Sequence, residues 1–290
     1  MLSKTFSLTI KQALKIEILK LKSSLEQEAF LDAQILLASV LKKDRSWLIA
    51  HDDEKLSKKQ SSSYNKLITK RAKHWPVAYL LNEKEFYGRK FMVNKDVLVP
   101  RPESELIIET ILPLLNKNSV LIDLGTGSGC LIISALLQNK NIKQAIAVDI
   151  SSQALKIAKQ NAKNYNLDKK IKFVKSDLLK NVNLNQLPKN SELIIMANLP
   201  YLTKKQMSEP SIKHEPKQAL VAGNDGLKYY RELKQQLKTR LPIGRNIDQK
   251  VTLICEINPG QKNGFKKLWP QTIFKKDLAG KTRLGIVKII

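Results

Sequence analysis

The chain has 290 residues, of which 42% are hydrophobic and 27% are charged, so it can form one large or two ordinary domains around a sizeable core. Its two cysteines are too few for a disulfide framework, no apolar run approaches the roughly 18–20 residues of a membrane span, and the first residues lack a signal-peptide pattern. We therefore expect a cytoplasmic globular protein without a metal site, because its three histidines are far apart in the sequence.

The charge is strongly positive, with 51 basic residues against 26 acidic ones and a net charge of +25. Only 8 of the basic residues are arginine, which binds phosphates and bases in a bidentate manner better than lysine does. We interpret the lysine excess as a solvated coat. The alternative interpretation is a basic face for RNA or for a partner close to the ribosome.

The first domain, residues 1–75, is predicted to be helical. Apolar residues recur every three or four positions in residues 10–21 and again in residues 31–41. Two serines that precede these runs, Ser3 and Ser24, are candidate helix starts, and Ser61–Ser63 is predicted to be a loop or cap. Nothing here resembles a catalytic constellation, so we expect a small helical bundle that docks a substrate.

The sequence pattern changes after residue 75. Residues 76–100 are predicted to be a linker with a β-hairpin, because aromatic and β-branched residues flank Gly88. In residues 101–290 strand and helix patterns alternate, which is typical of a mostly parallel, doubly wound sheet. The predicted strands, the last two of them a hairpin, are Val120–Leu124, Ala145–Asp149, Ile171–Lys175, Leu193–Ala197, Thr252–Ile257, Thr272–Phe274 and Leu284–Ile289.

A glycine-rich loop lies where the first of these strands passes into a helix, and an acid, Asp123, precedes its first glycine by two residues. Glycines there allow a tight turn and close approach of a ligand, and Asp149 at the end of the next strand can accept hydrogen bonds from ribose. A carboxylate would repel the pyrophosphate that a dinucleotide places at a helix N-terminus. It suits the cationic amino-acid end of S-adenosylmethionine, so the loop favours this cofactor over NAD; a glycine turn without a ligand is the third interpretation.

The predicted cofactor site extends along the ends of the strands. Asp177 and Leu178 follow the third strand, where this kind of fold usually contacts adenine, and Asn198 follows the fourth. The remaining predicted cofactor-binding residues are Asp123, Gly125, Thr126, Gly127, Ser128, Gly129 and Asp149.

The tetrapeptide Asn198-Leu199-Pro200-Tyr201 directly follows the fourth strand. Here the chain resembles amino-methyltransferases whose fourth strand ends in Asn/Asp-Pro-Pro-Tyr/Phe, and more narrowly the HemK/PrmC family. Further segments that resemble this family are Pro76–Tyr79, Glu83–Phe86, Val99–Glu105, Asp123–Gly129, Glu215–Leu220 and Asp277–Gly280. The resemblance implies an α/β fold, a Rossmann-like seven-stranded class I methyltransferase sheet of order 3-2-1-4-5-7-6 with the last-numbered strand antiparallel, preceded by a small N-terminal helical bundle.

The resemblance also implies a reaction. A methyl group would pass from S-adenosylmethionine to the side-chain amide nitrogen of the glutamine in the Gly-Gly-Gln motif of peptide chain release factors, which modulates translation termination. Release factors would be the protein partner, the enzyme would be a monomer, and no membrane would be involved.

An amide nitrogen is a poor nucleophile, because its lone pair is delocalised into the carbonyl. The resemblance implies that the Asn198 side-chain oxygen and the Leu199 carbonyl accept its two N–H hydrogens, and that Tyr201 packs on the amide plane. Asn198 and Tyr201 would be the catalytic residues, and the rate enhancement would come from positioning. The implied substrate-binding residues are Asn198, Leu199, Pro200, Tyr201 and Arg101.

Leu199 departs from the family pattern, which has proline at this position. Asn-Leu-Pro-Tyr is also typical of ribosomal RNA adenine dimethyltransferases, so an RNA or DNA adenine N6-methyltransferase is the alternative function. The Gly-Thr-Gly sequence of the loop, the Pro-Arg-Pro-Glu segment and the helical N-terminal domain favour the glutamine methyltransferase. Another protein glutamine target and a non-catalytic binding module are the remaining alternatives.

Several other residues have expected roles of lesser weight. Arg101 is expected either to line the cofactor site or to pair with Glu103 or Glu105. His214 is expected to anchor a loop. Three residues are expected to be structural or buried packing residues: Glu256, Cys130 and Cys255.

Overall fold

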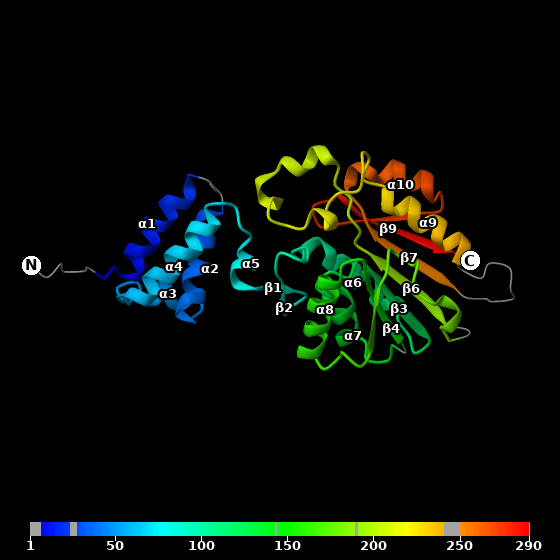
Figure 1. The fold of residues 1–290 in the computed structure, drawn as a ribbon, viewed down its shortest axis with the longest axis horizontal. Helices are drawn as coiled ribbons and strands as arrows, with labels where there is room; N and C mark the ends of the chain where they lie inside the picture. Colours follow the sequence, from blue (N-terminus) through cyan, green and yellow to red (C-terminus); the bar gives the residue numbers. More distant parts are fainter. Residues whose placement is uncertain (1–6, 24–27, 143, 189–190, 241–249, 290) are drawn as a thin grey trace, which may run out of the picture. The chain divides into compact units, whose positions relative to one another are not determined.

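The computed structural model describes residues 7–23, 28–142, 144–188, 191–240 and 250–289. Two compact units are present (Figure 1): a helical unit, Met1–Asn82 with Glu209–His214, and an α/β unit, Glu83–Ser208 with Glu215–Ile290. Within the described residues, every helix is too short or too polar to cross a bilayer.

The helical unit contains α1 (Ile10–Lys22), α2 (Ala29–Leu41), α3 (Arg45–Ala50), α4 (Lys58–Arg71) and α5 (Val77–Leu81). Helix α1 begins after Thr9, which forms a capping box with Gln12; the predicted starts at Ser3 and Ser24 lie outside the described residues. The prediction of a loop or cap at Ser61–Ser63 was wrong. These serines lie inside α4, whose start is instead set by a capping box at Ser57.

Apolar residues of these helices form one buried cluster. The unit extends past the predicted boundary at residue 75, because α5 packs against α2 and α4. The segment Glu209–His214 is fixed to it by His214, whose Nε2 lies 2.8 Å from the Lys73 carbonyl oxygen and whose ring stacks on Trp75. His214 is therefore a loop anchor, as predicted.

The α/β unit is built on seven strands, β3 (Ser119–Leu124), β4 (Gln144–Asp149), β5 (Ile171–Lys175), β6 (Glu192–Ala197), β7 (Val251–Glu256), β8 (Ile273–Lys276) and β9 (Thr282–Ile289). Their order in the sheet is β5-β4-β3-β6-β7-β9-β8. Strands β3 to β7 run parallel, and β9 runs antiparallel to both of its neighbours. This is the predicted strand order.

Helices cover both faces of the sheet (Figure 1), and alternate strand residues point to opposite faces. Val120 and Ile122 pack in the cluster of α9 (Lys228–Arg240) and α10 (Lys262–Leu268), whereas Leu121 packs in the opposite cluster. That opposite cluster contains residues of α6 (Glu105–Ile111), α7 (Cys130–Gln138) and α8 (Ser152–Asn164). The two cysteines are free and buried, one in each cluster, as expected.

The predicted hairpin is formed by β1 (Glu83–Phe86) and β2 (Arg89–Met92). Its two-residue turn has φ values of +50° at Tyr87 and +68° at Gly88, the pair of left-handed residues that a tight hairpin requires. Short 3₁₀ helices lie at Pro102–Ser104, Leu112–Leu114, Leu184–Gln186, Lys204–Ser208, Pro210–Ile212, Lys217–Ala219 and Pro259–Gln261.

Candidate active site

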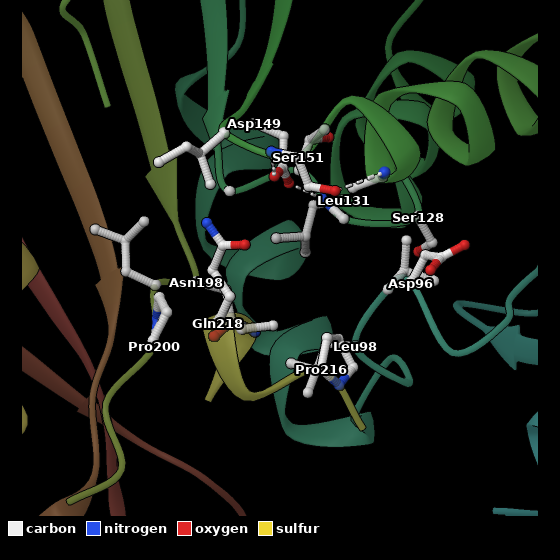
Figure 2. A pocket seen from close by; sticks show the side chains of 18 of the residues that line it. Asp96, Leu98, Ser128, Leu131, Asp149, Ser151, Asn198, Pro200, Pro216 and Gln218 are labelled. Atoms are coloured by element: carbon white, nitrogen blue, oxygen red, sulfur yellow. Dashed lines mark hydrogen bonds between the residues drawn. The ribbon is translucent and has the colours of Figure 1, made fainter. Parts of the chain in front are cut away.

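A cavity of about 310 Å³ lies at the carboxyl ends of β3, β4, β5 and β6 (Figure 2). This edge is where ligands bind in open α/β sheets, beside the point where the strand order reverses. Predicted site residues that line it are Gly125, Thr126, Gly127, Ser128, Asp149, Asp177, Leu178, Asn198, Leu199, Pro200 and Arg101. Asp123, Gly129 and Tyr201 are not among the lining residues.

The glycine loop crosses the floor of this cavity. Gly125, Gly127 and Gly129 all have positive φ, between +53° and +79°, a backbone region that favours glycine. A Cβ at Gly129 would lie 3.2 Å from that of Ala158, so this glycine lets α7 pack closely against α8. A Cβ at Gly127 would meet no atom closer than 3.9 Å, which leaves the backbone there open to a ligand.

Asp149 holds the glycine loop to the end of β4. Its two carboxylate oxygens accept hydrogen bonds from the backbone N–H groups of Gly127 and Ser151, each at 2.9 Å. Burial raises the pKa of this carboxyl, and the backbone donors oppose the rise. Because Asp149 also lines the cavity, its remaining lone pairs are available to the hydroxyls of a ribose.

The Asp123 carboxylate is fully buried. Thr126 Oγ1 donates to Asp123 Oδ2 at 2.7 Å, whereas Asp123 Oδ1 makes no hydrogen bond with a described residue. Burial raises the pKa of Asp123 to about 7; the Thr126 hydroxyl opposes the rise, and the charge of Asp149 adds to it. A buried acid with an unused acceptor next to a cavity-lining residue fits a cationic ligand group and opposes a pyrophosphate. The residues present thus fit S-adenosylmethionine.

Asp177 and Leu178 line the part of the cavity next to β5. Leu178 has a φ of +52°, which is uncommon for a branched side chain, and its neighbour Leu179 donates its N–H to Gln236 Oε1 at 2.8 Å. Asp177 Oδ2 accepts a hydrogen bond from Lys180 at 2.6 Å. The chain is therefore held in a strained turn against the cavity.

Asn198 directly follows β6 and presents its amide at the cavity wall. Its Nδ2 donates to Ser104 Oγ at 2.9 Å, and Ser104 Oγ donates to Glu256 Oε2 at 2.6 Å. With the nitrogen engaged, the Oδ1 of Asn198 has no hydrogen-bond partner among the described residues. An acceptor is thus left at the end of the strand where the resemblance implied one.

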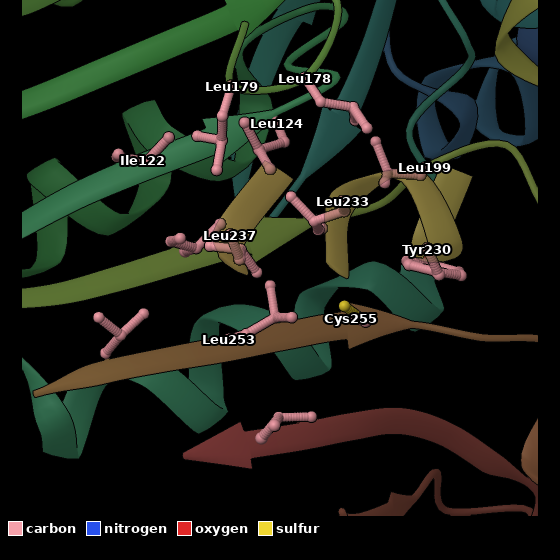
Figure 3. Packing of buried hydrophobic residues seen from close by; sticks show 14 of the residues in the cluster. Ile122, Leu124, Leu178, Leu179, Leu199, Tyr230, Leu233, Leu237, Leu253 and Cys255 are labelled. Atoms are coloured by element: carbon pink, nitrogen blue, oxygen red, sulfur yellow. The ribbon is translucent and has the colours of Figure 1, made fainter. Parts of the chain in front are cut away.

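Leu199 is 4% exposed and packs in the apolar cluster of α9, with Leu233 and Tyr230 nearby (Figure 3). Burial raises the pKa of the Tyr230 hydroxyl well above its usual value, and the backbone amide of Leu199 acts in the opposite direction. The side chain that replaces the family's proline is therefore a core residue, anchored by packing. It also meets the glycine loop, because a Cβ at Gly125 would lie 3.3 Å from its Cδ2.

Tyr201 and Arg101 have partners that sequence reasoning missed. The Tyr201 hydroxyl donates to Glu256 Oε1 at 3.3 Å, and its backbone carbonyl accepts from Gln261. Arg101 was expected to line the cofactor site or to pair with Glu103 or Glu105. It forms its ion pair with Glu215 instead, at 2.5 Å. Glu215 also accepts from the Val99 N–H, so one buried acid ties the Pro216–Ala219 wall of the cavity to the segment before α6.

Comparisons with known proteins show which family this chain resembles. Residues 12–81 match the PrmC N-terminal domain, and residues 106–222 match a methyltransferase domain. The chain is 34% identical to the release factor glutamine methyltransferase of Bacillus cereus, over 88% of this chain and 90% of that protein. It is 32% identical to that of Coxiella burnetii, over 97% and 99%.

The chain belongs to the release factor glutamine methyltransferase family. The family resemblance and the class I methyltransferase fold predicted from sequence are confirmed. The S-adenosylmethionine cofactor is confirmed as well, since methyltransferase domains of this class use it. Among solved structures, the hMettl16 catalytic domain in complex with an RNA hairpin has a TM-score of 0.52 at 16% identity, over 76% of this chain and 79% of that one. At this identity the similarity shows the fold alone.

Proposed function

We propose that this protein transfers a methyl group from S-adenosylmethionine to the side-chain amide nitrogen of the glutamine in the Gly-Gly-Gln motif of peptide chain release factors, and thereby modulates translation termination. The observation that carries the proposal is the amide of Asn198, which is held through its nitrogen and leaves its oxygen available in the cavity. Relatives that match nearly the whole chain bear the name of this activity.

In this proposal residues at the strand ends would hold the cofactor. The loop Gly125–Gly129 offers its backbone, with Thr126 and Ser128 at the wall, and Asp149 binds the ribose hydroxyls. Asp177 and the backbone at Leu178 take the adenine. Asp123 acts on the cationic amino-acid end by electrostatic attraction across Thr126 rather than by contact, because it is fully buried behind the loop. When bound, the cofactor supplies the methyl group on a sulfonium leaving group.

The protein's part in the chemistry is to orient the substrate amide. Asn198 Oδ1 accepts one N–H hydrogen and the Leu199 carbonyl accepts the other, which fixes the plane of the amide and the direction of the nitrogen lone pair. Positioned acceptors of this kind lower the barrier without a strong base. As the methyl group joins the nitrogen, one N–H proton leaves to water.

The predicted substrate site has three further residues. Pro200 and Arg101 line the cavity, and we assign them to the substrate backbone near the glutamine. Tyr201 does not itself line the cavity; we assign it to support the amide plane from the end of the motif, with its hydroxyl held by Glu256. The ion pair of Arg101 with Glu215 would keep the wall of the cavity in place while the substrate enters.

We assign release-factor docking to the helical unit. It bears an apolar groove whose lining includes Leu19, Phe30 and Ile49, which are 62%, 57% and 71% exposed. Its charged lining residues are three lysines, Lys11, Lys15 and Lys22, and one acid, Asp52, which pairs with Lys11 at 3.2 Å, so the lining has a net positive charge. Exposed apolar surface rimmed by positive charge suits an amphipathic, acidic surface of a protein substrate. We further propose that the enzyme acts as a monomer in the cytoplasm, where release factors meet the ribosome.

A labelling experiment distinguishes the two candidate substrates. The protein would be incubated with methyl-labelled S-adenosylmethionine and with a release factor, a release factor whose Gly-Gly-Gln is changed to Gly-Gly-Ala, or ribosomal RNA. We expect label only in the unchanged release factor. Label in the RNA instead would support the adenine N6-methyltransferase and refute the proposal.

A further inference from the structure

One buried carboxylate holds both ends of the Asn198–Tyr201 motif. Glu256, at the end of β7, is 2% exposed. Its Oε2 accepts from Ser104 Oγ at 2.6 Å, and its Oε1 accepts from the Tyr201 hydroxyl at 3.3 Å. Ser104 in turn accepts from Asn198 Nδ2 at 2.9 Å. The sequence suggested a structural role for Glu256, but its contacts lead directly to the candidate site.

The direction of this chain of hydrogen bonds is fixed by chemistry. An ionised carboxylate can only accept, so the single hydroxyl hydrogen of Ser104 is used toward Glu256. Ser104 Oγ can then only accept from Asn198, and of the two ends of the Asn198 amide only the nitrogen can donate. The amide is therefore turned with Nδ2 toward Ser104 and Oδ1 toward the substrate.

The reverse orientation would disable the site. If Ser104 donated its hydrogen to Asn198, the Asn198 oxygen would be occupied and its NH₂ group would face the substrate. Two N–H donors would then oppose each other where the substrate amide has to be held. A side-chain amide has a similar shape in both orientations, so packing alone does not select between them. The Glu256 carboxylate, two hydrogen bonds away, does select between them, because it can only accept.

We propose that Ser104 and Glu256 are positioning residues that set the orientation of the Asn198 side-chain amide, so that its oxygen accepts the hydrogen of the substrate amide. The inference rests on the proposed function and deepens it. Ser104 and Glu256 act through Asn198, and Glu256 also holds the hydroxyl of Tyr201.

Protonation of Glu256 would release the constraint. Burial raises its pKa, opposed by the Ser104 and Tyr201 hydrogen bonds and by the charge of Arg283. Glu103 adds a like charge, and the Tyr230 hydroxyl is bonded to the Glu256 backbone carbonyl. A protonated Glu256 can donate to Ser104, which allows the amide to turn. The turnover number should therefore fall on the acid side of its pH profile.

The first test uses three serine variants with a release factor as substrate. Ser104→Ala should lower kcat by about tenfold or more, with the KM for the release factor and the affinity for S-adenosylhomocysteine within about twofold. Ser104→Thr keeps the hydroxyl and should retain kcat within about threefold. The matched control is Ser134→Ala, a buried serine of α7 whose Oγ has no hydrogen-bond partner among the described residues, and it should leave kcat unchanged. Equal kcat in Ser104→Ala and Ser134→Ala would overturn the inference.

Glu256→Gln is the second variant and remains informative if Ser104→Ala does not fold. A glutamine can both donate and accept, so it no longer fixes the direction of the hydrogen bonds from Asn198 through Ser104. We expect kcat to fall by about tenfold or more and the acid limb of its pH profile to disappear. Wild-type kcat with an unchanged acid limb in this variant would overturn the inference.

A measurement without turnover separates this inference from the proposed function. The side-chain NH₂ signal of Asn198 can be assigned by NMR through its loss in Asn198→Ala. If Nδ2 is bound to Ser104, its hydrogens should exchange with solvent more slowly in the wild type than in Ser104→Ala. Equal exchange rates in the wild type and in Ser104→Ala would overturn the inference about Ser104 and Glu256, even if the enzyme methylates release factors. Slow exchange without release-factor methylation would refute the proposed function, while the positioning of Asn198 by Ser104 and Glu256 would still be supported.

Discussion

The clearest single perturbation of cofactor binding is Asp149→Ala. In the wild type the carboxylate accepts two backbone hydrogen bonds at 2.9 Å, from Gly127 and Ser151, while it lines the cavity. The variant loses the carboxylate that we propose as the acceptor for the ribose, and it frees the Gly127 N–H that this carboxylate holds. Hydrogen bonds to charged groups contribute about 1.5–3 kcal/mol, so affinity should fall about ten- to hundredfold.

The assay is isothermal titration calorimetry with S-adenosylhomocysteine, with the melting temperature of each variant measured in parallel. Asp168→Ala is a matched control, because Asp168 does not line the cavity, and its affinity should equal that of the wild type. A folded Asp149→Ala protein whose affinity stays within about twofold of the wild type would refute the ribose assignment.

Four further predictions follow from the described contacts. Asn198→Ala should abolish most methyl transfer in a turnover assay while calorimetric cofactor affinity changes little; a large loss of affinity would assign Asn198 to the cofactor instead. Leu199→Pro keeps the carbonyl, so turnover per folded molecule should persist, while lost packing lowers the free energy of unfolding by about 1–3 kcal/mol in denaturant titrations. Abolished turnover there would mean that the Leu199 N–H is required. Gly129→Ala, at a φ of +79° and 3.2 Å from the Ala158 Cβ, should cost about 1–3 kcal/mol of stability by the same measurement, and no loss would contradict the close packing of α7 on α8. Burial raises the pKa of Asp123 to about 7 in the folded, cofactor-free protein, whereas in the unfolded chain this carboxyl has its ordinary pKa of 3.8. Between these pH values the folded protein binds a proton that the unfolded chain has lost. The free energy of unfolding should therefore fall as the pH rises from 3.8 to about 7. A bound cation favours the ionised form of Asp123, so calorimetric cofactor affinity should increase as the pH rises through about 7. Asp123→Asn should remove this increase. The same pH dependence of affinity in the wild type and in Asp123→Asn would contradict the prediction.

The strand order and the glycine loop were predictable because their signals are local. Residues 120–124 form an apolar run that ends in glycines, and such a run needs helices on both faces of the sheet, which the chain provides. The tetrapeptide at Asn198 is likewise contiguous. The short helix α10 (Lys262–Leu268) was missed, since of its residues only Phe265 is buried.

The partners of the site residues could not be predicted, because they are far apart in the sequence. Ser104 and Glu256 are 152 residues apart, and Arg101 and Glu215 are 114 apart. No periodicity encodes such pairs, and they exist only once the sheet brings the ends of its strands together. The error at Ser61–Ser63 has a different cause: three serines suggested a loop, but α4 exposes a polar face that tolerates them.

The measurement that tests the central claim most directly is peptide mass spectrometry of a release factor incubated with this protein and S-adenosylmethionine. Wild-type protein should add the mass of one methylene group to the peptide that contains Gly-Gly-Gln, with fragment ions placing it on the glutamine side chain. Asn198→Ala protein, folded and able to bind the cofactor, should leave that peptide unmodified. An unmodified glutamine with the wild-type enzyme, or an equal gain with Asn198→Ala, would contradict the account.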